Sequence, residues 1–233
     1  MKIFKNEKLI KRNAKIGQYT SIAALAVLGV GMYISFKRQD LFIYSIAALI
    51  LGFAMTQIGM FFSNRWGRSP RPDEQLDAAM KGLPGDTRMY HYATPVGHLL
   101  VGPAGLWILE MYHQRGHVVY SRNRWRLTGG GFMQAYMSVF GQEGIGRPEL
   151  DVANETNALK KYLAKHMDES EIPEIQAALV FTNEQAEVDA TDAPIPALKA
   201  KQLKDFIRQK AKEHPLGSLQ LQQIVSILPS DES

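Results

Sequence analysis

The stretch VGHLLVGPAGLWILEMYHQRG, residues 96–116, decides the fold of this chain. Its first apolar run, residues 98–101, ends at Gly102-Pro103, and a second apolar run occupies residues 106–111. A Gly-Pro-Ala-Gly turn between two short apolar runs is typical of a hairpin, because proline presets φ and glycine accepts the positive φ of a tight turn. The pattern therefore predicts two adjacent antiparallel strands.

One carboxylate, Glu110, stands inside the second apolar run. A carboxylate in an apolar strand costs free energy unless another group pairs with it. Two interpretations are open. Glu110 either forms a salt bridge or faces solvent at a sheet edge, or it is a functional group near the end of its strand.

The segment resembles the nuclease-related domain family, a branch of the restriction-endonuclease-like fold. Without a gap, the motif positions of that family are matched by His98, Gly102, Pro103, Gly105, Glu110 and Gly116. Two motif positions differ. The metal-binding aspartate of the family falls on Gly97, and its catalytic lysine falls on Tyr112.

The resemblance implies an α/β fold, with a restriction-endonuclease-like α-β-β-β-α-β domain and C-terminal helices over residues 73–228. It also implies a site in which two carboxylates hold Mg²⁺ and a lysine helps to position the attacking water. Glu74 matches the helix glutamate of the family, so the residual site is Glu110 with Glu74. Glycine at 97 offers no ligand and tyrosine at 112 is neutral near pH 7, so we expect no catalysis and no bound metal.

Two uncharged runs precede this domain, at residues 19–36 and 41–63. At the rise of an α-helix they reach roughly 27 and 34 Å, enough to cross a bilayer. A cleaved signal peptide and a pair of buried core helices are the alternatives. A second full-length run and the lack of a polar stripe favour a transmembrane hairpin. We therefore expect a basic arm at 1–18, two transmembrane helices at 19–63, a linker at 64–72 and a tail at 229–233.

The distribution of basic residues predicts the orientation of this hairpin. Six basic residues precede the first run, and Arg65, Arg68 and Arg71 follow the second. By the positive-inside rule, both termini and the soluble domain face the cytoplasm, at the inner membrane. The bilayer is thus the first expected partner.

The net charge of +4 is unevenly placed. Residues 1–63 hold 8 Lys and Arg against 2 acids, so the remainder holds 19 basic and 21 acidic residues of the 27 and 23 in the chain. Bulk charge therefore does not indicate a nucleic-acid-binding domain. A local cluster could still contact phosphate or lipid headgroups, and its members are Arg115, Arg122, Arg124 and Arg126. The chain has no cysteine, which excludes disulfides and thiolate metal sites.

The remaining sequence predicts helices at 73–81, 148–167, 198–212 and 219–228, and strands at 87–92, 117–120, 122–126 and 175–182. Residues 127–147 are glycine-rich, with a short helix expected at 132–140 and either a partner surface or a loose lid around it.

Three functions fit these expectations. The first is a catalytically inactive nuclease-related domain that acts as a cytoplasmic interaction or assembly module with a protein partner. The second is an accessory subunit of a larger integral-membrane complex, in which the hairpin is the working part. The third is a metal-dependent nuclease with relocated catalytic residues, the only case that requires Mg²⁺.

Overall fold

The computed structural model describes residues 1–128 and 144–230, which form two compact units. One unit is Glu7–Glu74. The other combines Met1–Asn6 with the chain from Gln75 onward. The short helix expected at 132–140, and most of the glycine-rich segment around it, lie outside the described residues.

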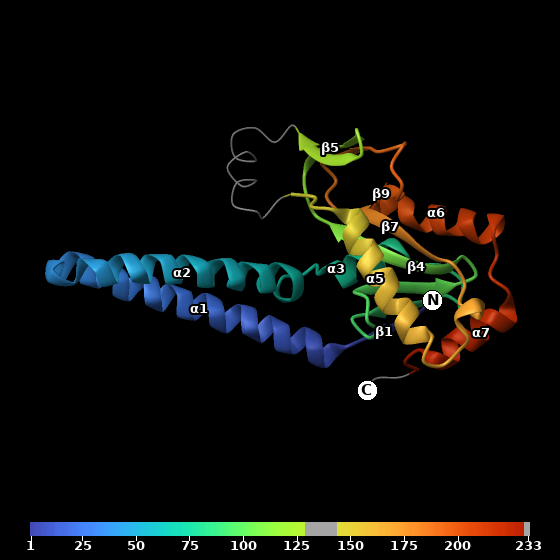
Figure 1. Cartoon of the computed structure of the whole chain (residues 1–233), viewed down its shortest axis with the longest axis horizontal. Helices are drawn as coiled ribbons and strands as arrows, with labels where there is room; N and C mark the ends of the chain where they lie inside the picture. The colour runs from blue at the N-terminus through green and yellow to red at the C-terminus, as the bar shows by residue number, and fades with distance from the viewer. Residues whose placement is uncertain (129–143, 231–233) are drawn as a thin grey trace. The chain divides into compact units, whose positions relative to one another are not determined.

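The first unit is an antiparallel helical pair (Figure 1). Helix α1 spans Glu7–Lys37, a 3₁₀ turn follows at Gln39–Leu41, and helix α2 spans Phe42–Phe62. A π-helical turn, Ser63–Gly67, ends it. Among the described residues, two helices are long and apolar enough to cross a membrane. Only 11% and 6% of the residues in their most apolar windows are buried, which core helices of a soluble protein would not show.

Glycines let the two helices approach each other closely. A Cβ built on Gly59 would lie 2.4 Å from the Ser21 hydroxyl oxygen, and one on Gly52 would lie 2.6 Å from the Leu28 side chain. The contact surface continues at Gly31 and Gly17. Small residues serve this purpose in membrane helices, because lipid tails provide no hydrophobic force between helices and close packing must stabilise the pair.

The second unit is built on a six-stranded mixed sheet with the order β1-β2-β3-β4-β7-β9. Strands β2, β3 and β4 are antiparallel neighbours, whereas β1 is parallel to β2, and β7 is parallel to both β4 and β9. The strands are β1 Lys2–Lys5, β2 Arg88–His91, β3 His98–Gly102, β4 Gly105–Tyr112, β7 Ile175–Phe181 and β9 Ala197–Lys199.

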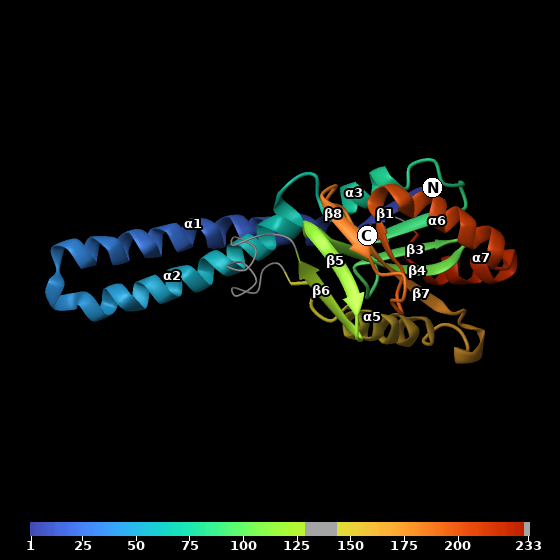
Figure 2. The ribbon, with the colours of Figure 1, turned by 90° about the horizontal axis from the view of Figure 1, so that it is seen from above.

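Helices cover both faces of this sheet. Strand alternation sends Leu100 and Trp107 into a core with the end of α3 (Pro72–Ala79) and with α6 (Ala200–Glu213). On the opposite face, Leu99 and the neighbouring apolar side chains pack against α5 (Pro148–Leu163) and α7 (Ser218–Ile227). Figure 2 shows α5 and α6 on opposite sides of the strands. A 3₁₀ turn, Glu169–Glu171, follows α5.

A smaller three-stranded sheet has the order β6-β5-β8, with β5 Gly116–Ser121, β6 Arg124–Thr128 and β8 Ala186–Asp189. Arg122 and Asn123 form the β5–β6 turn with φ of 51° and 57°, the backbone of a two-residue hairpin. The apolar face of this sheet packs around Val118, Leu179 and Phe181.

The expected mixed α/β class and the pair of long apolar helices are confirmed. The element order α3, β2, β3, β4, α5, β7 also follows the expected α-β-β-β-α-β order, with β5 and β6 inserted before α5. Two expectations are corrected. The helix expected at 198–212 begins at Ala200, because residues 197–199 pair with β7 as strand β9, and within the expected basic arm residues 2–5 form edge strand β1, with α1 beginning at Glu7. Lys2 and Lys5 obscured this strand in the sequence, but Phe4 stacks on Tyr90 with ring centroids 4.9 Å apart.

The glycine contacts make a prediction about the hairpin. Gly59→Leu should destabilise it by about 1–3 kcal/mol, because the new side chain meets the Ser21 hydroxyl and backbone. Gly29→Leu is the matched control: nothing lies within 4 Å of a Cβ there, so its effect should stay within about 0.5 kcal/mol. Thermal unfolding in detergent, followed by circular dichroism, measures both. Equal effects would contradict the packing described.

Candidate functional site

Glu110 lies on the face of β4 that is covered by α5. Leu106 and Ile108 point into the core beneath α5 and α7, and Glu110 continues their alternation as a half-buried residue near the end of the strand. Its backbone partner in β7 is Leu179. The position is therefore central in the sheet, and the carboxylate faces a helix rather than a sheet edge.

Gly97 directly precedes β3. The β3–β4 pairing ends at Leu99 and Ile108, two residues short of Gly97 and of Glu110. The N–H of Gly97 donates to Oε1 of Glu155 on α5, at 3.4 Å. A helix carboxylate thus contacts the backbone at Gly97, the position where the resemblance implies an aspartate.

Glu155 was not singled out by sequence reasoning, although a signal for it exists. It shares one face of α5 with Val152 and the buried Leu159, three before and four after it. An acid on the inward face of a helix indicates a polar partner on the sheet. By contrast Lys160 and Lys161, on the same helix, are exposed.

Tyr112, where the resemblance implies a lysine, is partly buried and packs against the apolar cluster around Phe181. Its ring stacks on Phe181 with centroids 5.3 Å apart. Burial raises the pKa of its hydroxyl above the ordinary value, and the charges of Glu110, Asp151, Glu149 and Glu155 raise it further. The hydroxyl therefore stays neutral and can only exchange hydrogen bonds.

The acids that face Tyr112 come from β4 and from the start of α5. Glu149 accepts a 2.6 Å hydrogen bond from the indole Nε1 of Trp125, and acids in the first turn complement the helix dipole. Carboxylate oxygens are the ligands that Mg²⁺ prefers. Over residues 1–128 and 144–230, however, no three side chains of His, Asp or Glu come together in an arrangement that could hold a metal ion.

Glu74, the second predicted site residue, belongs to the helical unit, whereas Glu110 belongs to the α/β unit. Its Oε2 accepts hydrogen bonds from the backbone N–H of Arg71 at 2.8 Å and from the Ser69 hydroxyl at 2.9 Å. Its other oxygen lies 3.2 Å from the Arg71 guanidinium. The carboxylate is therefore engaged in capping the N-terminus of α3.

The four arginines of the predicted cluster are exposed. Arg124 and Arg126 project from the outer face of edge strand β6, whose other face carries Trp125 and Leu127 into the core. The register places Asp189 on this outer face, two strands away from Arg126. The surface is therefore of mixed charge, with its basic side at the edge strand, where charges also deter strand pairing with other chains.

A buried polar chain on the opposite face of the sheet is a second candidate. Lys5 Nζ lies 2.6 Å from Asp77 Oδ2, and Asp77 Oδ1 accepts from His91 Nε2 at 2.9 Å. The Nδ1 atoms of His91 and His98 lie 2.8 Å apart. Since the carboxylate only accepts, His91 donates from Nε2 to Asp77, and one proton is shared between the Nδ1 atoms of His91 and His98.

These polar contacts assign His98 a structural role. Its ring nitrogen is engaged by His91, and its ring packs edge-on against Tyr92 with centroids 4.9 Å apart. Lys5 comes from β1 and Asp77 from α3, the elements directly before and after the helical pair. Sequence reasoning noted His98 alone, because only the register of β2 against β3 sets His91 beside it.

Comparison of the chain with models of protein families, with curated proteins and with solved structures finds no match.

The polar contacts of Asp77 with Lys5 and His91 predict that its substitution lowers the stability of the protein. Asp77→Asn should destabilise the protein by about 1–3 kcal/mol, because the amide ends the ion pair with Lys5 and offers His91 a weaker acceptor. Asp205→Asn is the matched control: its side chain is 80% exposed beside Arg208, so the loss should be within about 0.5 kcal/mol. Chemical denaturation measures both. An unaffected Asp77→Asn variant would contradict the network.

Glu74 predicts a pH dependence. The hydrogen bond from the Arg71 N–H, with that from Ser69, holds the pKa of this carboxyl below its usual range. A lowered pKa contributes stability above the unfolded pKa of about 4.3, and this contribution disappears as the pH falls through the folded value. Glu74→Gln should therefore be less stable than wild type at pH 7 and equal to it in strong acid.

The control for Glu74 is Glu169→Gln, at an exposed glutamate, which should show no such convergence. Unfolding curves from pH 7 down to acid measure the difference. A constant gap between Glu74→Gln and wild type would contradict the capping role.

Proposed function

We propose that this protein is a membrane-anchored, restriction-endonuclease-like domain of the nuclease-related type that has given up cleavage and acts as an interaction or assembly module. The order and pairing of α3, β2, β3, β4, α5 and β7 support the fold, because the three antiparallel strands are followed by a helix and a strand parallel to β4. The β3–β4 hairpin carries the motif residues in the expected strands.

The packing of Tyr112 carries the proposal. A nuclease of this kind needs a cation beside the attacking water, and a lysine supplies it through its charge. Here the position holds a neutral phenol stacked on Phe181, and nearby carboxylates raise its pKa further. Tyr112 therefore supplies no positive charge beside Glu110, and a neutral phenol does not attract a phosphodiester as a lysine would.

The connectivity supports a hairpin with both ends on one side of the membrane. Strand β1 ends two residues before α1 begins, and it pairs with β2 in the same unit as the chain from Gln75 onward. A folded sheet cannot be divided by a bilayer, so both hairpin ends must emerge together. The basic residues that flank the spans favour the cytoplasmic side of the inner membrane.

A second candidate function is a metal-dependent nuclease in which Glu155 replaces the missing aspartate. The observation that favours it is the hydrogen bond from the Gly97 N–H to Glu155, together with the charges of Glu155 and Glu110, which both act on the Tyr112 hydroxyl. Two carboxylates suffice to hold Mg²⁺ when waters and substrate phosphate complete its shell. This arrangement supplies the metal ligands but leaves the lysine position filled by Tyr112.

One assay separates the two functions. The full chain in nanodiscs is incubated with supercoiled plasmid and Mg²⁺ or Mn²⁺, beside Glu110→Gln and Glu155→Gln. These isosteric amides keep the shape of the site and remove its charge. We expect wild type to cleave no faster than either variant. Cleavage by wild type that falls at least about a hundredfold in both variants, as expected when a metal ligand is lost, would overturn the non-catalytic proposal and establish the second candidate.

The interaction role is tested on the same chain. Purified from its native membranes, the wild type should retain a stoichiometric protein partner, and Arg124→Glu with Arg126→Glu should lose it if β6 is the docking edge. Retention by that variant, together with loss in Leu25→Ser on the exposed surface of α1, would instead make the hairpin the working part of a membrane complex. If neither the wild type nor the variants retain a protein partner, both the interaction module and the membrane-complex role would be contradicted.

A further inference from the structure

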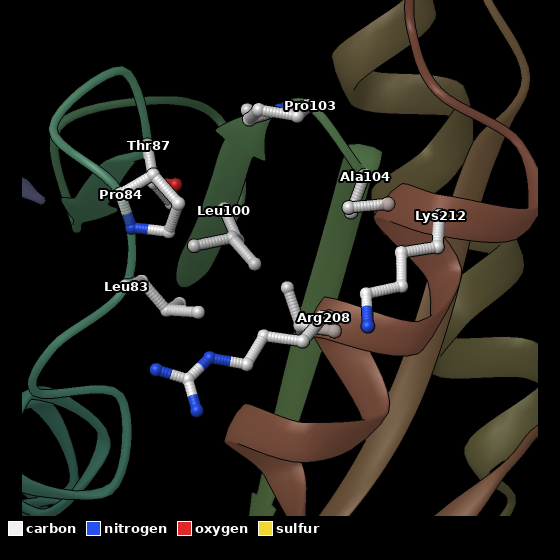
Figure 3. A pocket seen from close by; sticks show the side chains of 11 residues that line it. Leu83, Pro84, Thr87, Leu100, Pro103, Ala104, Arg208 and Lys212 are labelled. Carbon is white, nitrogen blue, oxygen red and sulfur yellow. The ribbon is translucent and has the colours of Figure 1, made fainter.

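An open pocket of ≈ 420 Å³ lies between the loop at residues 83–87, the β3–β4 turn and α6. Figure 3 shows α6 contributing Arg208 and Lys212 on one side, across from Leu83 and Pro84. The volume falls within the range of small-molecule sites, about 300–1,000 Å³. Its apolar wall consists of Leu83, Pro84, Leu100, Ala104, Ile207 and Ala211.

The pocket opens directly onto the core of the α/β unit. Leu100 and Ile207 are 1% and 3% exposed, and both belong to the apolar cluster between the sheet and α6. Gly102 leaves space beside Thr87, because a Cβ there would lie 3.2 Å from the threonine backbone and hydroxyl. The floor is therefore rigid and apolar, and it offers a ligand hydrophobic contact rather than hydrogen bonds.

The two cations at the pocket, Arg208 and Lys212, differ in whether an acid pairs with them. Arg208 donates to the carbonyl of Gly82 at 3.0 Å and lies 3.5 Å from Asp205. The acid next to Lys212 along the chain, Glu213, is engaged by Lys210 at 2.7 Å. In the part of the chain that the structure describes, Lys212 has no ion-pair partner, so the pocket carries about one unbalanced positive charge.

We propose that this pocket binds a fatty carboxylate, with the alkyl chain against Leu100 and Ile207 and the carboxylate at Lys212 and Arg208. The apolar wall requires a hydrocarbon body, and the single unbalanced cation matches a monoanion better than a phosphate dianion. A charge-assisted hydrogen bond between ammonium and carboxylate fixes the head of the ligand. The site is separate from Glu110 and Tyr112, which lie on the α5 face of β4, whereas Leu100 and Ala104 face α6.

The test uses the full chain in phosphatidylcholine nanodiscs with a photoreactive diazirine analogue of palmitic acid. After irradiation, labelled peptides are mapped by mass spectrometry. We expect label in the segments 83–87, 100–104 and 207–212, and competition by unlabelled palmitate. Lys212→Glu should weaken this labelling roughly tenfold, the loss expected when a hydrogen bond to a charged group is replaced by repulsion.

Two further variants keep the test specific. Lys161→Glu makes the same charge change on α5, which covers the other face of the sheet, and should label as wild type does. Ala211→Trp fills the pocket from a partly exposed position and should abolish labelling there. Circular dichroism establishes that each variant is folded.

Three results would overturn the proposal. The first is label confined to α1 and α2, which would reflect partition into the bilayer. The second is equal pocket labelling in wild type and Lys212→Glu. The third is labelling of the same segments by a photoreactive phosphatidylglycerol and not by the fatty acid, since the occupant would then be a phospholipid.

Discussion

The register of β3 against β4 is the constraint on which the rest of the α/β unit depends. Pairing of Leu99 with Ile108 sends alternate side chains into two separate cores, one beneath α5 and α7 and one beneath α3 and α6. A slip of one residue would exchange the two sets and turn Glu110 to the other face. The Gly-Pro-Ala-Gly turn prevents this slip, because Gly105 adopts a φ of 95° that other residues rarely adopt.

Sequence reasoning succeeded where structure depends on neighbours along the chain. The hairpin, α5 and β7 follow from turn chemistry and from apolar periodicity, and the pair of long apolar helices follows from composition. It failed where the deciding partner is remote. Strand β1 exists because β2 and Tyr90 lie beside it, and β9 is a three-residue strand that pairs with β7. Neither β1 nor β9 has an apolar alternation of its own in the sequence.

In the candidate site, too, local sequence patterns could be interpreted and contacts with remote segments could not. Glu110 and Tyr112 could be placed on their strand from the hairpin pattern, whereas the role of Glu74 could not, because a helix glutamate caps its own helix as readily as it serves a site. The helical pattern places Glu155 on the inward face of α5, but only the packing of α5 on the sheet identifies its partner, the Gly97 N–H.

The participation of β1 in the sheet has a consequence for biogenesis. Lys2 pairs with Arg88, and both long apolar helices lie between them in the chain. The first strand therefore leaves the ribosome well before its neighbour exists, and the sheet edge forms only after both helices have been made. If the pair spans a membrane as proposed, failure of either helix to cross would leave residues 2–5 on the opposite side of the bilayer from β2, so completing the sheet acts as a check that both helices have crossed.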